Sequence, residues 1–335
     1  MPSSIHRMRA AVITRPGGPE VLEIRNVDDP VIEDDGLLVR VHASGINRAD
    51  IHQRNGGYPA PPGSPADIPG LEYAGEVAAV GSAVRGFAMG DRVYGIAGGG
   101  AHAELLAIPA RTAARFPASL SWTDAGAIPE AFITAHDALR QADARPGEAV
   151  LVHAVGSGVG LAAAQLCHAW GMHCLGTART PQKLDRAREF GVEAGLALGT
   201  DLSPLAPFVR EHTDGRGVDV ALDLVGGPYL DATLGSMATL GRIVLVGTMA
   251  GSRGELDYRR LLQGRVTLRG TVLRARPIEE RIAVTRRFGA EVGPALASGA
   301  VRPVVDSRFP LDELPRAHER LESNATFGKV VVTMS

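Results

Sequence analysis

The sequence predicts an α/β protein in which a doubly wound parallel sheet is inserted into a β-rich body. Three observations lead to this fold class. The chain has 335 residues, which is too long for one ordinary core, so two domains are expected. Residues 9–127 carry strand and turn signals without helix–strand alternation, whereas Ile128–Gly270 alternates strands and helices, and the remainder returns to strands. The expected domains are residues 1–127 with 271–335, and residues 128–270.

The β-rich body is expected to be largely antiparallel, since its strands are separated by short turns rather than helices. Its strands and late elements are expected at Ala10–Thr14, Leu22–Val27, Leu37–Ser44, Glu72–Val80, a helix Pro277–Ala297, Val304–Ser307, a helix Leu311–Glu322, and Lys329–Thr333. Gly45–Asp50 starts a short polar helix or turn. The loop Gly56–Gly70 (GGYPAPPGSPADIPG) excludes regular structure, and loops of this length are usually functional or disordered.

The inserted segment alternates regularly, which predicts a doubly wound parallel sheet. Its expected strands are Ala149–His153, His173–Thr177, Val218–Leu224, Arg242–Gly247 and Val266–Gly270. Its expected helices are Val159–Trp170, Pro181–Phe190, Pro204–His212, Leu230–Thr239 and Asp257–Gly264.

A glycine-dense turn joins the first strand of this sheet to its first helix. The G-x-G-x-x-G fingerprint would need glycine at Leu161, and the turn instead reads A-x-x-S-x-x-G from Ala154 to Gly160. Glycine-rich turns also serve plain structural roles, but here a parallel sheet surrounds the turn. We therefore expect the pyrophosphate of a dinucleotide on the backbone at Ser157, Gly158 and Val159.

The residues after the second strand favour NADPH over NADH. An NAD site usually places a carboxylate about 20 residues past the first glycine, and no acidic residue lies between Glu148 and Asp185. Arg179, Thr180 and Lys183 instead offer the positive charge and hydroxyl that a 2′-phosphate requires. The alternative is that these residues are simply solvated at the start of a helix.

Composition disfavours several other functions. The net charge is −2 and only 4% of residues are aromatic, so no basic, aromatic surface for nucleic acid is expected. No apolar run approaches the roughly 18 residues of a membrane helix, and a cytoplasmic protein is expected. Cys167, His168, His173 and Cys174 lack the spacing of a structural zinc site, which favours buried cysteines over a metal.

Several short motifs are spread over the chain. They are Gly45–Asp50 (GINRAD), Gly70–Gly75 (GLEYAG), Gly90–Val93 (GDRV), Ile128–Thr134 (IPEAFIT), Val150–Gly160, Leu273–Pro277 (LRARP), the opening PGGPEVLE, the GGYPAPPG loop and the closing GKVVV. Taken together, these motifs resemble the medium-chain dehydrogenase/reductase superfamily, in its zinc-free quinone oxidoreductase branch with zeta-crystallin. Within that branch the tumour-suppressor-inducible NADPH quinone oxidoreductases are most similar. The resemblance covers essentially the whole chain and implies a Rossmann cofactor domain inserted in a GroES-like catalytic domain.

The resemblance also bears on metal. Zinc enzymes of the superfamily have a cysteine at the place of Asn47 and a histidine at the place of Leu71, and neither residue present here is a good zinc ligand. Without a Lewis acid to hold an alkoxide, the expected acceptor is already electrophilic, such as a quinone or an alkene conjugated to a carbonyl.

Further site residues are implied by the same resemblance. Asn47 and Thr134 would meet the nicotinamide half of the cofactor. The segments that would close around it contribute Gly247, Met249, Leu273, Arg274 and Arg276. Met249 and Leu273 could equally fill core. In the most similar subgroup a tyrosine of the third sheet strand approaches the ribose phosphate, and its place here is Leu198.

Tyr58 is the expected residue at the chemistry, together with Asn47. A phenol in the Pro/Gly-rich loop can donate a hydrogen bond to an acceptor oxygen as negative charge develops there, or stack on the acceptor ring. The alternative is an aromatic that anchors the loop. Asp50 is a weaker candidate, for which capping of the local turn is the favoured role.

The function expected from the sequence is therefore NADPH-dependent hydride transfer to quinones, without zinc. One alternative is NADPH-dependent reduction of conjugated C=C bonds in alkenals, enones or enoyl thioesters. An alternative of another class is a non-catalytic NADPH- or RNA-binding protein. The resemblance implies a homodimer or homotetramer joined through edge strands of the cofactor sheets.

Overall fold

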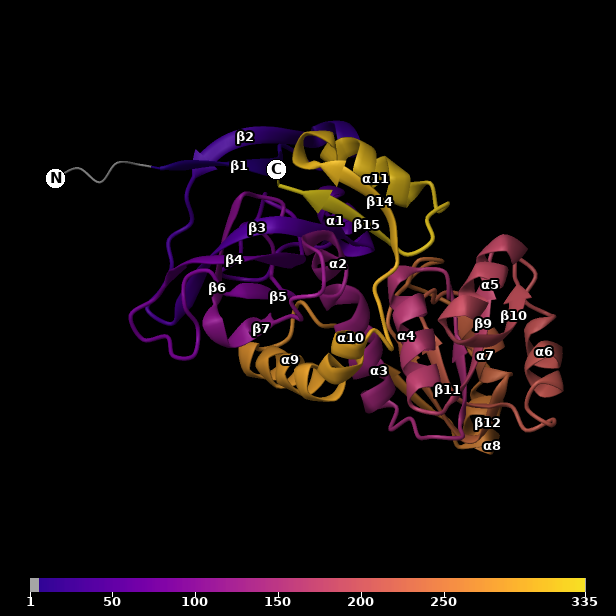
Figure 1. Ribbon diagram of the computed structural model, residues 1–335. Coiled ribbons are helices and arrows are strands. Elements are labelled where there is room, and N and C mark those ends of the chain that lie inside the picture. Colours follow the sequence, from indigo (N-terminus) through magenta and orange to yellow (C-terminus); the bar gives the residue numbers. More distant parts are fainter. Residues whose placement is uncertain (1–5, 335) are drawn as a thin grey trace. The chain divides into compact units, whose positions relative to one another are not determined.

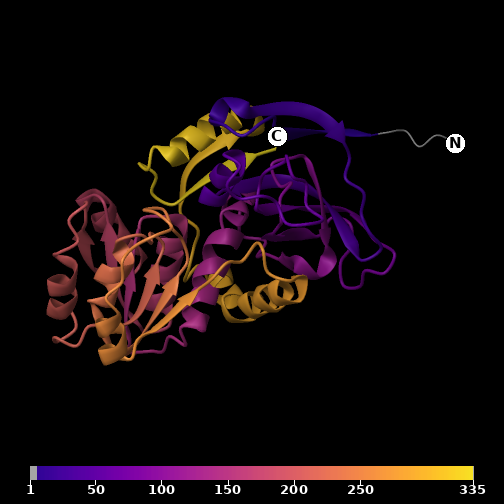
Figure 2. The same cartoon turned by 180° about the vertical axis from the view of Figure 1, so that it is seen from behind.

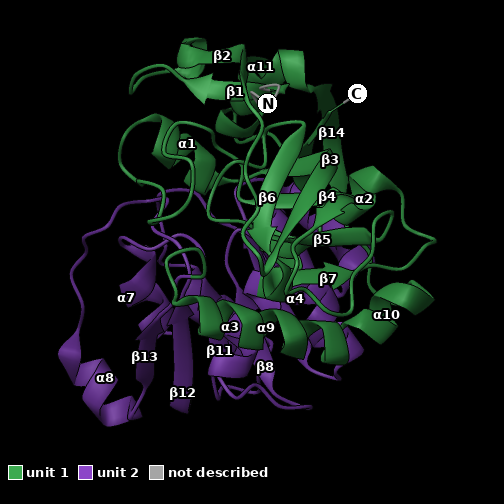
Figure 3. Cartoon of the chain, turned by 90° about the vertical axis from the view of Figure 1, so that its left-hand side faces the viewer, with its two compact units in different colours: residues 1–133, 273–335 green, residues 134–272 purple. Residues whose placement is uncertain are grey.

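The structure is a computed structural model, and it describes residues 6–334 (Figure 1). The chain divides into two compact units, which are described separately (Figure 3). Unit 1 comprises Met1–Ile133 and Leu273–Ser335, and unit 2 comprises Thr134–Val272. The chain passes between the units after residues 133 and 272, whereas the sequence predicted these boundaries after residues 127 and 270.

Unit 2 contains a six-stranded sheet in which every neighbouring pair is parallel. The strand order is β10-β9-β8-β11-β12-β13, so the chain starts in the middle and winds outward in both directions. The strands are β8 (Ala149–Val152), β9 (His173–Ala178), β10 (Val192–Ala197), β11 (Val218–Asp223), β12 (Met237–Leu245) and β13 (Thr267–Gly270). The predicted doubly wound sheet is confirmed.

Helices flank this sheet on both faces (Figures 1 and 2). They are α3 (Thr134–Gln141), α4 (Gly158–Ala169), α5 (Pro181–Ala187), the 3₁₀ turn η4 (Arg188–Phe190), α6 (Leu205–Glu211), α7 (Tyr229–Leu234) and α8 (Tyr258–Gly264). The expected helix Leu230–Thr239 is wrong at its end. Strand β12 already begins at Met237, which pairs with Val218, so sheet pairing overrides local helix propensity there.

Unit 1 is built on a mixed sheet in the order β14-β15-β3-β4-β5-β7, with β6 paired to β3. Its pairs are antiparallel except β14 with β15. These strands are β3 (Gly36–Ile46), β4 (Glu72–Val80), β5 (Arg92–Ile96), β6 (Leu105–Pro109), β7 (Ala113–Arg115), β14 (Val305–Pro310) and β15 (Lys329–Thr333). A separate antiparallel pair is formed by β1 (Arg7–Ile13) and β2 (Leu22–Asp28).

The helices of unit 1 are short except one. They are η1 (Pro19–Val21), α1 (Arg48–Arg54), η2 (Ala110–Thr112), α2 (Trp122–Gly126), the π-helix η3 (Pro129–Ile133), α9 (Ile278–Glu291), α10 (Gly293–Ser298), η5 (Leu311–Glu313) and α11 (Leu314–Glu322). The single helix expected over Pro277–Ala297 is wrong. It breaks at Val292, because Pro294 has no N–H to continue the helical bonding and is accommodated in the first turn of α10.

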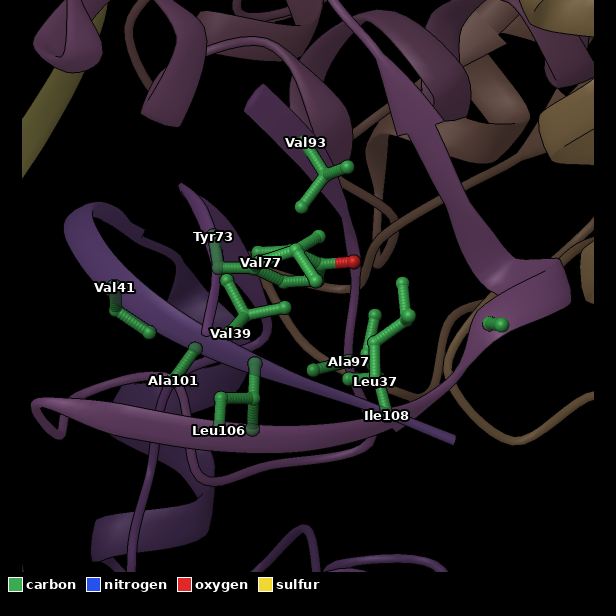
Figure 4. Close-up of a cluster of buried hydrophobic side chains, with 11 residues drawn as sticks. Leu37, Val39, Val41, Tyr73, Val77, Val93, Ala97, Ala101, Leu106 and Ile108 are labelled. Carbon is green, nitrogen blue, oxygen red and sulfur yellow. The ribbon is translucent and has the colours of Figure 1, made fainter. Parts of the chain in front are cut away.

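A buried cluster fixes the central strands of unit 1 (Figure 4). Leu37, Val39 and Val41 point from β3 into this core at alternate positions, where Tyr73 and Val77 of β4 meet them. Burial of one face sets the register, since a slip by one residue would turn every apolar side chain outward. The core therefore fixes the register of β3 against β4, and candidate site residues of unit 1 lie at the ends of these strands.

Strand β13 forms one edge of the unit 2 sheet, and all four of its residues are exposed. The homodimer that the sequence implied through such an edge stays a prediction. Within residues 6–334, no helix combines the length and the apolar character needed to cross a membrane.

Candidate functional site

The turn after β8 in unit 2 has the geometry of an anion site. Ala154 adopts the left-handed conformation with φ of 49°, which turns the chain sharply at the end of the strand. Ser157 then caps α4, since its hydroxyl accepts from the N–H of Gly160 at 3.1 Å. A Cβ on Gly160 would lie 2.6 Å from the carbonyl oxygen of Ala154, so only glycine permits this close turn.

The free donors of this turn are backbone groups. Among the described residues, the N–H groups of Gly158 and Val159 have no hydrogen-bond partner at the start of the twelve-residue helix α4. The positive end of the helix dipole reinforces them, so a phosphate fits here. Leu161, where the fingerprint would have glycine, is buried at 1% exposure. Gly160 is instead the glycine at which the first turn of α4 packs closely against the backbone of Ala154 and Val155.

Basic residues lie at the end of the neighbouring strand β9. Arg179 and Thr180 are exposed and Lys183 is half-buried on the first turn of α5. The expected tyrosine position, Leu198, is buried at 2% exposure in the core of unit 2 and offers no hydroxyl. The 2′-phosphate contact that the subgroup has at this position is therefore absent here.

Tyr229, at the start of α7, is a further candidate near the cofactor site that the sequence does not suggest. Its hydroxyl lies 3.5 Å from the carbonyl oxygen of Gly199, one residue past Leu198, and its ring packs edge-on against His153. Burial raises the pKa of the Tyr229 phenol, while the charge of Arg179 opposes that rise. The structure thus brings another tyrosine beside Arg179. The signal available in the sequence was an aromatic directly after Gly226-Gly227-Pro228 at a strand end.

Three other expected contacts lie in unit 2. A Cβ on Gly247 would approach the carbonyl oxygen of Leu224 to 2.7 Å, so glycine is needed where β12 leaves the sheet. Met249 is 46% exposed and therefore does not fill core. The hydroxyl of Thr134 is buried and has no hydrogen-bond partner among the residues described, as expected for a group that meets a ligand.

Three strand ends of unit 1 bring together a buried charged cluster. Asn47 follows β3, Glu72 begins β4 and Lys329 begins β15, and the antiparallel pairing of these strands places the three residues at one edge. The ammonium of Lys329 lies 2.6 Å from Glu72 Oε1 and donates to Asn47 Oδ1 at 2.5 Å. Asn47 Nδ2 donates to Glu72 Oε1 at 2.9 Å. Gly45 leaves room for this pair, since a Cβ there would clash with the Glu72 carboxylate.

Glu130 joins this cluster from the π-helix η3. Its backbone N–H donates to Glu72 Oε2 at 2.8 Å. Its own carboxyl oxygen Oε2 is buried and has no hydrogen-bond partner in the described part of the chain. Burial raises the pKa of Glu130 to about 8, the charge of Glu72 adds to that rise, and Lys329 opposes it. The carboxyl is therefore mostly protonated at neutral pH.

Tyr58 and Arg274 form a second part of the same unit. Arg274 is 3% exposed; it donates to the carbonyl oxygen of Gly98 at 2.7 Å and to Gln53 Oε1 at 2.8 Å. Its guanidinium carbon lies 5.1 Å from the Tyr58 ring centroid. Burial raises the pKa of the half-buried Tyr58 phenol, Arg274 opposes this and Glu130 adds to it. Its Nη1 also donates to the carbonyl oxygen of Tyr58 at 3.5 Å, so Arg274 contacts the Tyr58 loop, and its expected place at the cofactor stays a prediction.

The remaining candidates of unit 1 are simpler. Asp50 is a structural residue, since its carboxylate accepts from the N–H of Asn47 at 2.8 Å and of Gly70 at 2.9 Å. This agrees with the capping role. Leu273 is buried at 8% exposure and Arg276 is half-buried.

The residues at the zinc positions do not suit a metal. Leu71 is fully buried and has no donor atom, and the amide of Asn47 is held by Glu72 and Lys329. An ammonium between these groups repels a divalent cation. No set of three His, Cys, Asp or Glu side chains within residues 6–334 is arranged to hold a metal ion.

The chain has full-length relatives of known class. A family model for the alcohol dehydrogenase GroES-like domain matches residues 33–118, and one for zinc-binding dehydrogenases matches residues 200–332. The chain is 32% identical to a quinone oxidoreductase of Lama guanicoe, with 98% of each chain covered. It is 34% identical to a quinone oxidoreductase of Pseudomonas aeruginosa, covering 94% of this chain and 96% of that one.

Solved structures give the same class. Mycobacterial Rv1454c complexed with NADPH superposes with a TM-score of 0.88 at 31% identity, covering 98% of this chain and 100% of that chain. Escherichia coli quinone oxidoreductase complexed with NADPH gives 0.86 at 30% identity, covering 98% and 99%. The chain therefore belongs to the medium-chain dehydrogenase/reductase superfamily, as its motifs predicted. It is an oxidoreductase, and quinone oxidoreductases are among its relatives.

Sequence reasoning missed the charged core of the site. Glu72 and Glu130 lie inside motifs that were read only as family markers, GLEYAG and IPEAFIT. Lys329 had a detectable signal, since it is one of two lysines in the chain and starts an apolar strand. A lysine at a buried strand end requires a buried anion, although the sequence does not say which one.

The Lys329–Glu72 pair provides a test of stability. Lys329→Met leaves the Glu72 carboxylate buried without its countercharge, so the free energy of unfolding in urea should fall by about 3–5 kcal/mol. The double variant Glu72→Gln/Lys329→Met should recover part of that loss, because neither member of the pair is then left as an unpaired buried charge. Lys183→Met, at the only other lysine, is the control and should change stability by less than about 1 kcal/mol. Equal stabilities of Lys329→Met and the wild type would refute the buried pair.

Proposed function

We propose that this protein is an NADPH-dependent oxidoreductase that reduces quinones without zinc. The observation that carries the proposal is the occupation of the zinc positions by Leu71 and by an Asn47 amide tied to Lys329. Such a site offers no Lewis acid, so the acceptor must itself be electrophilic. The full-length likeness to quinone oxidoreductases supports quinones as that acceptor.

The cofactor of this reaction is NADPH, which supplies a hydride when it is bound. In unit 2 the free N–H groups of Gly158 and Val159, beside Ser157, would hold its pyrophosphate. Arg179, Thr180 and Lys183 would hold its 2′-phosphate. For the nicotinamide half, the resemblance implies contacts with Asn47, Thr134, Gly247, Met249, Leu273, Arg274 and Arg276.

Tyr58 acts on the acceptor. Its half-buried phenol stays protonated, because burial raises its pKa, and it can donate a hydrogen bond to the acceptor oxygen as charge develops there. Arg274 contacts the loop that carries Tyr58, since its Nη1 donates to the carbonyl oxygen of Tyr58 at 3.5 Å and its guanidinium lies beside the Tyr58 ring. Preorganised donors of this kind stabilise the transition state without reorganising.

The function is tested by steady-state NADPH oxidation across a panel of acceptors. The panel consists of 1,4-benzoquinone, 9,10-phenanthrenequinone, trans-2-alkenals and crotonyl-CoA, and the quinones should give the highest kcat/KM. Dialysis against a chelator should leave quinone turnover unchanged. Faster turnover of the alkenals or of crotonyl-CoA would replace the proposal with conjugated-alkene reduction. NADPH binding without oxidation by any acceptor would indicate a non-catalytic binding protein.

The cofactor preference is tested at the end of β9. Arg179→Ala and Lys183→Ala should each weaken NADPH binding by about tenfold, as expected for the loss of a charge-assisted hydrogen bond, and leave NADH binding unchanged. Titration of nucleotide fluorescence measures both dissociation constants. Arg186→Ala, exposed later on α5, is the control. Equal losses for NADPH and NADH would show that these side chains do not contact a 2′-phosphate.

The role of the Tyr58 hydroxyl is tested by Tyr58→Phe. The kcat for quinone reduction should fall by about 10–100-fold, because one donor to the developing negative charge is lost. Tyr258→Phe, at a residue 71% exposed, is the matched control. Full quinone turnover in Tyr58→Phe would exclude the hydrogen-bonding role, and Tyr58→Ala would then measure stacking alone.

A further inference from the structure

Reduction of a quinone consumes a proton as well as a hydride, and the buried acid Glu130 has no role in the function proposed above. We propose that Glu130 is the catalytic acid that donates this proton to the oxygen of the reduced acceptor. The inference rests on the proposed quinone reduction and adds the source of its proton.

The position of the Glu130 carboxyl is the first support. It lies on the π-helix Pro129–Ile133, a rare backbone form that is frequent at functional sites. The Glu130 N–H is tied to Glu72 Oε2 at 2.8 Å, which fixes this turn of chain to the charged cluster. The carboxyl Oε2 is buried and has no hydrogen-bond partner within the described residues. A buried polar atom of this kind needs a partner, and an acceptor oxygen would provide one.

The surroundings keep this carboxyl protonated. Two carboxylates face it, Glu72 from β4 and Asp50 from α1, and both disfavour its ionisation. Two cations, Lys329 from β15 and Arg274, act in the opposite direction. Burial is the largest effect, and together these raise the pKa of Glu130 to about 8. An acid with a pKa near the working pH is both protonated and able to transfer its proton.

Glu130 and Tyr58 have separate roles in this scheme. The charge of Glu130 raises the pKa of Tyr58, and both groups raise the pKa of Arg274, so both lie in the neighbourhood of Arg274 in unit 1. A phenol whose pKa is raised by burial holds its proton and serves as a hydrogen-bond donor. Glu130 is the stronger acid, so it is the group that releases a proton.

The step balances as follows. The quinone would accept a hydride from bound NADPH: a nicotinamide C–H bond breaks, a bond from that hydrogen to the quinone forms, and the displaced π electrons reside on a quinone oxygen. The O–H bond of the Glu130 carboxyl breaks, a new O–H bond forms on that oxygen, and Glu130 is left as a carboxylate. The Glu130 carboxyl oxygen Oε2 is buried, but the residue as a whole is partly exposed, so its proton returns from solvent. The sum is quinone, NADPH and one proton giving hydroquinone and NADP⁺.

The test compares Glu130→Gln, Glu130→Asp and the wild type over pH. In the wild type, kcat should fall as the pH rises through about 8, because the carboxylate cannot donate. Glu130→Gln should lower kcat about 100-fold and lose this alkaline limb, while the dissociation constant of NADPH stays the same. Glu130→Asp, which keeps an acid, should recover part of kcat and of the limb. Glu319→Gln, at an exposed residue of α11, is the matched control.

A readout independent of turnover is the infrared band of a protonated carboxyl. In the wild type it should lose intensity between about pH 6 and about pH 10, and it should be absent in Glu130→Gln. An unchanged kcat and pH profile in Glu130→Gln would overturn the proposal, as would a band that is already absent at low pH. If Glu130→Gln does not fold, the pH dependence of kcat in Glu130→Asp and the infrared titration of the wild type test the proposal in its place. If the wild type turns over no quinone, the proposed function itself fails, and the infrared titration still reports whether Glu130 is a buried acid.

Discussion

The ion pair between Lys329 and Glu72 is the interaction on which the rest of unit 1 depends. Both side chains are withdrawn from water, with 6% and 0% exposure, and their charges lie 2.6 Å apart. Such a pair adds little net stability compared with apolar residues, but either charge alone would be costly. Its effect is therefore on specificity. It requires the start of β15, the start of β4 and the segment after β3 to meet at one edge of the sheet.

The charges of this pair determine the chemistry of its neighbours. Glu72 has one oxygen on Lys329 and Asn47 and the other on the N–H of Glu130. Burial is the largest cause of the raised pKa of Glu130, the charge of Glu72 adds to the rise, and the charge of Lys329 opposes it. The cluster thus keeps one carboxyl protonated beside another that is paired with a lysine, which is a common way to separate the roles of two carboxyl groups.

The sequence predicted the scaffold better than the site, and the reason is physical. Strand and helix periodicity is local, so the alternation of unit 2 apart from β10, and the bounds of β4 and β15, could be read directly. Contacts formed by topology are not local. Nothing near Glu72 in the sequence points to Lys329, more than 250 residues later, and nothing near Leu198 points to Tyr229. The helix break at Val292 was missed for a different reason, because apolar periodicity continues through Gly293 and Pro294.

The replacement of metal ligands by a lysine network constrains the reaction that unit 1 can support. A metal ion would accept an oxygen lone pair and stabilise an alkoxide, whereas an ammonium already bound to a carboxylate, an amide oxygen and a carbonyl has no donor left for a substrate. Negative charge that develops on an acceptor oxygen must then be met by a hydrogen bond and removed by a proton. Tyr58 and Glu130 are suited to these two tasks because both are protonated and therefore neutral. The free-energy cost of burying a neutral group is much smaller than the cost of burying a charge. In the proposed reaction, the quinone is itself the electrophile, so no metal is needed to activate it. A metal ion would also stabilise the negative charge on the acceptor oxygen, and here Glu130 instead protonates that oxygen.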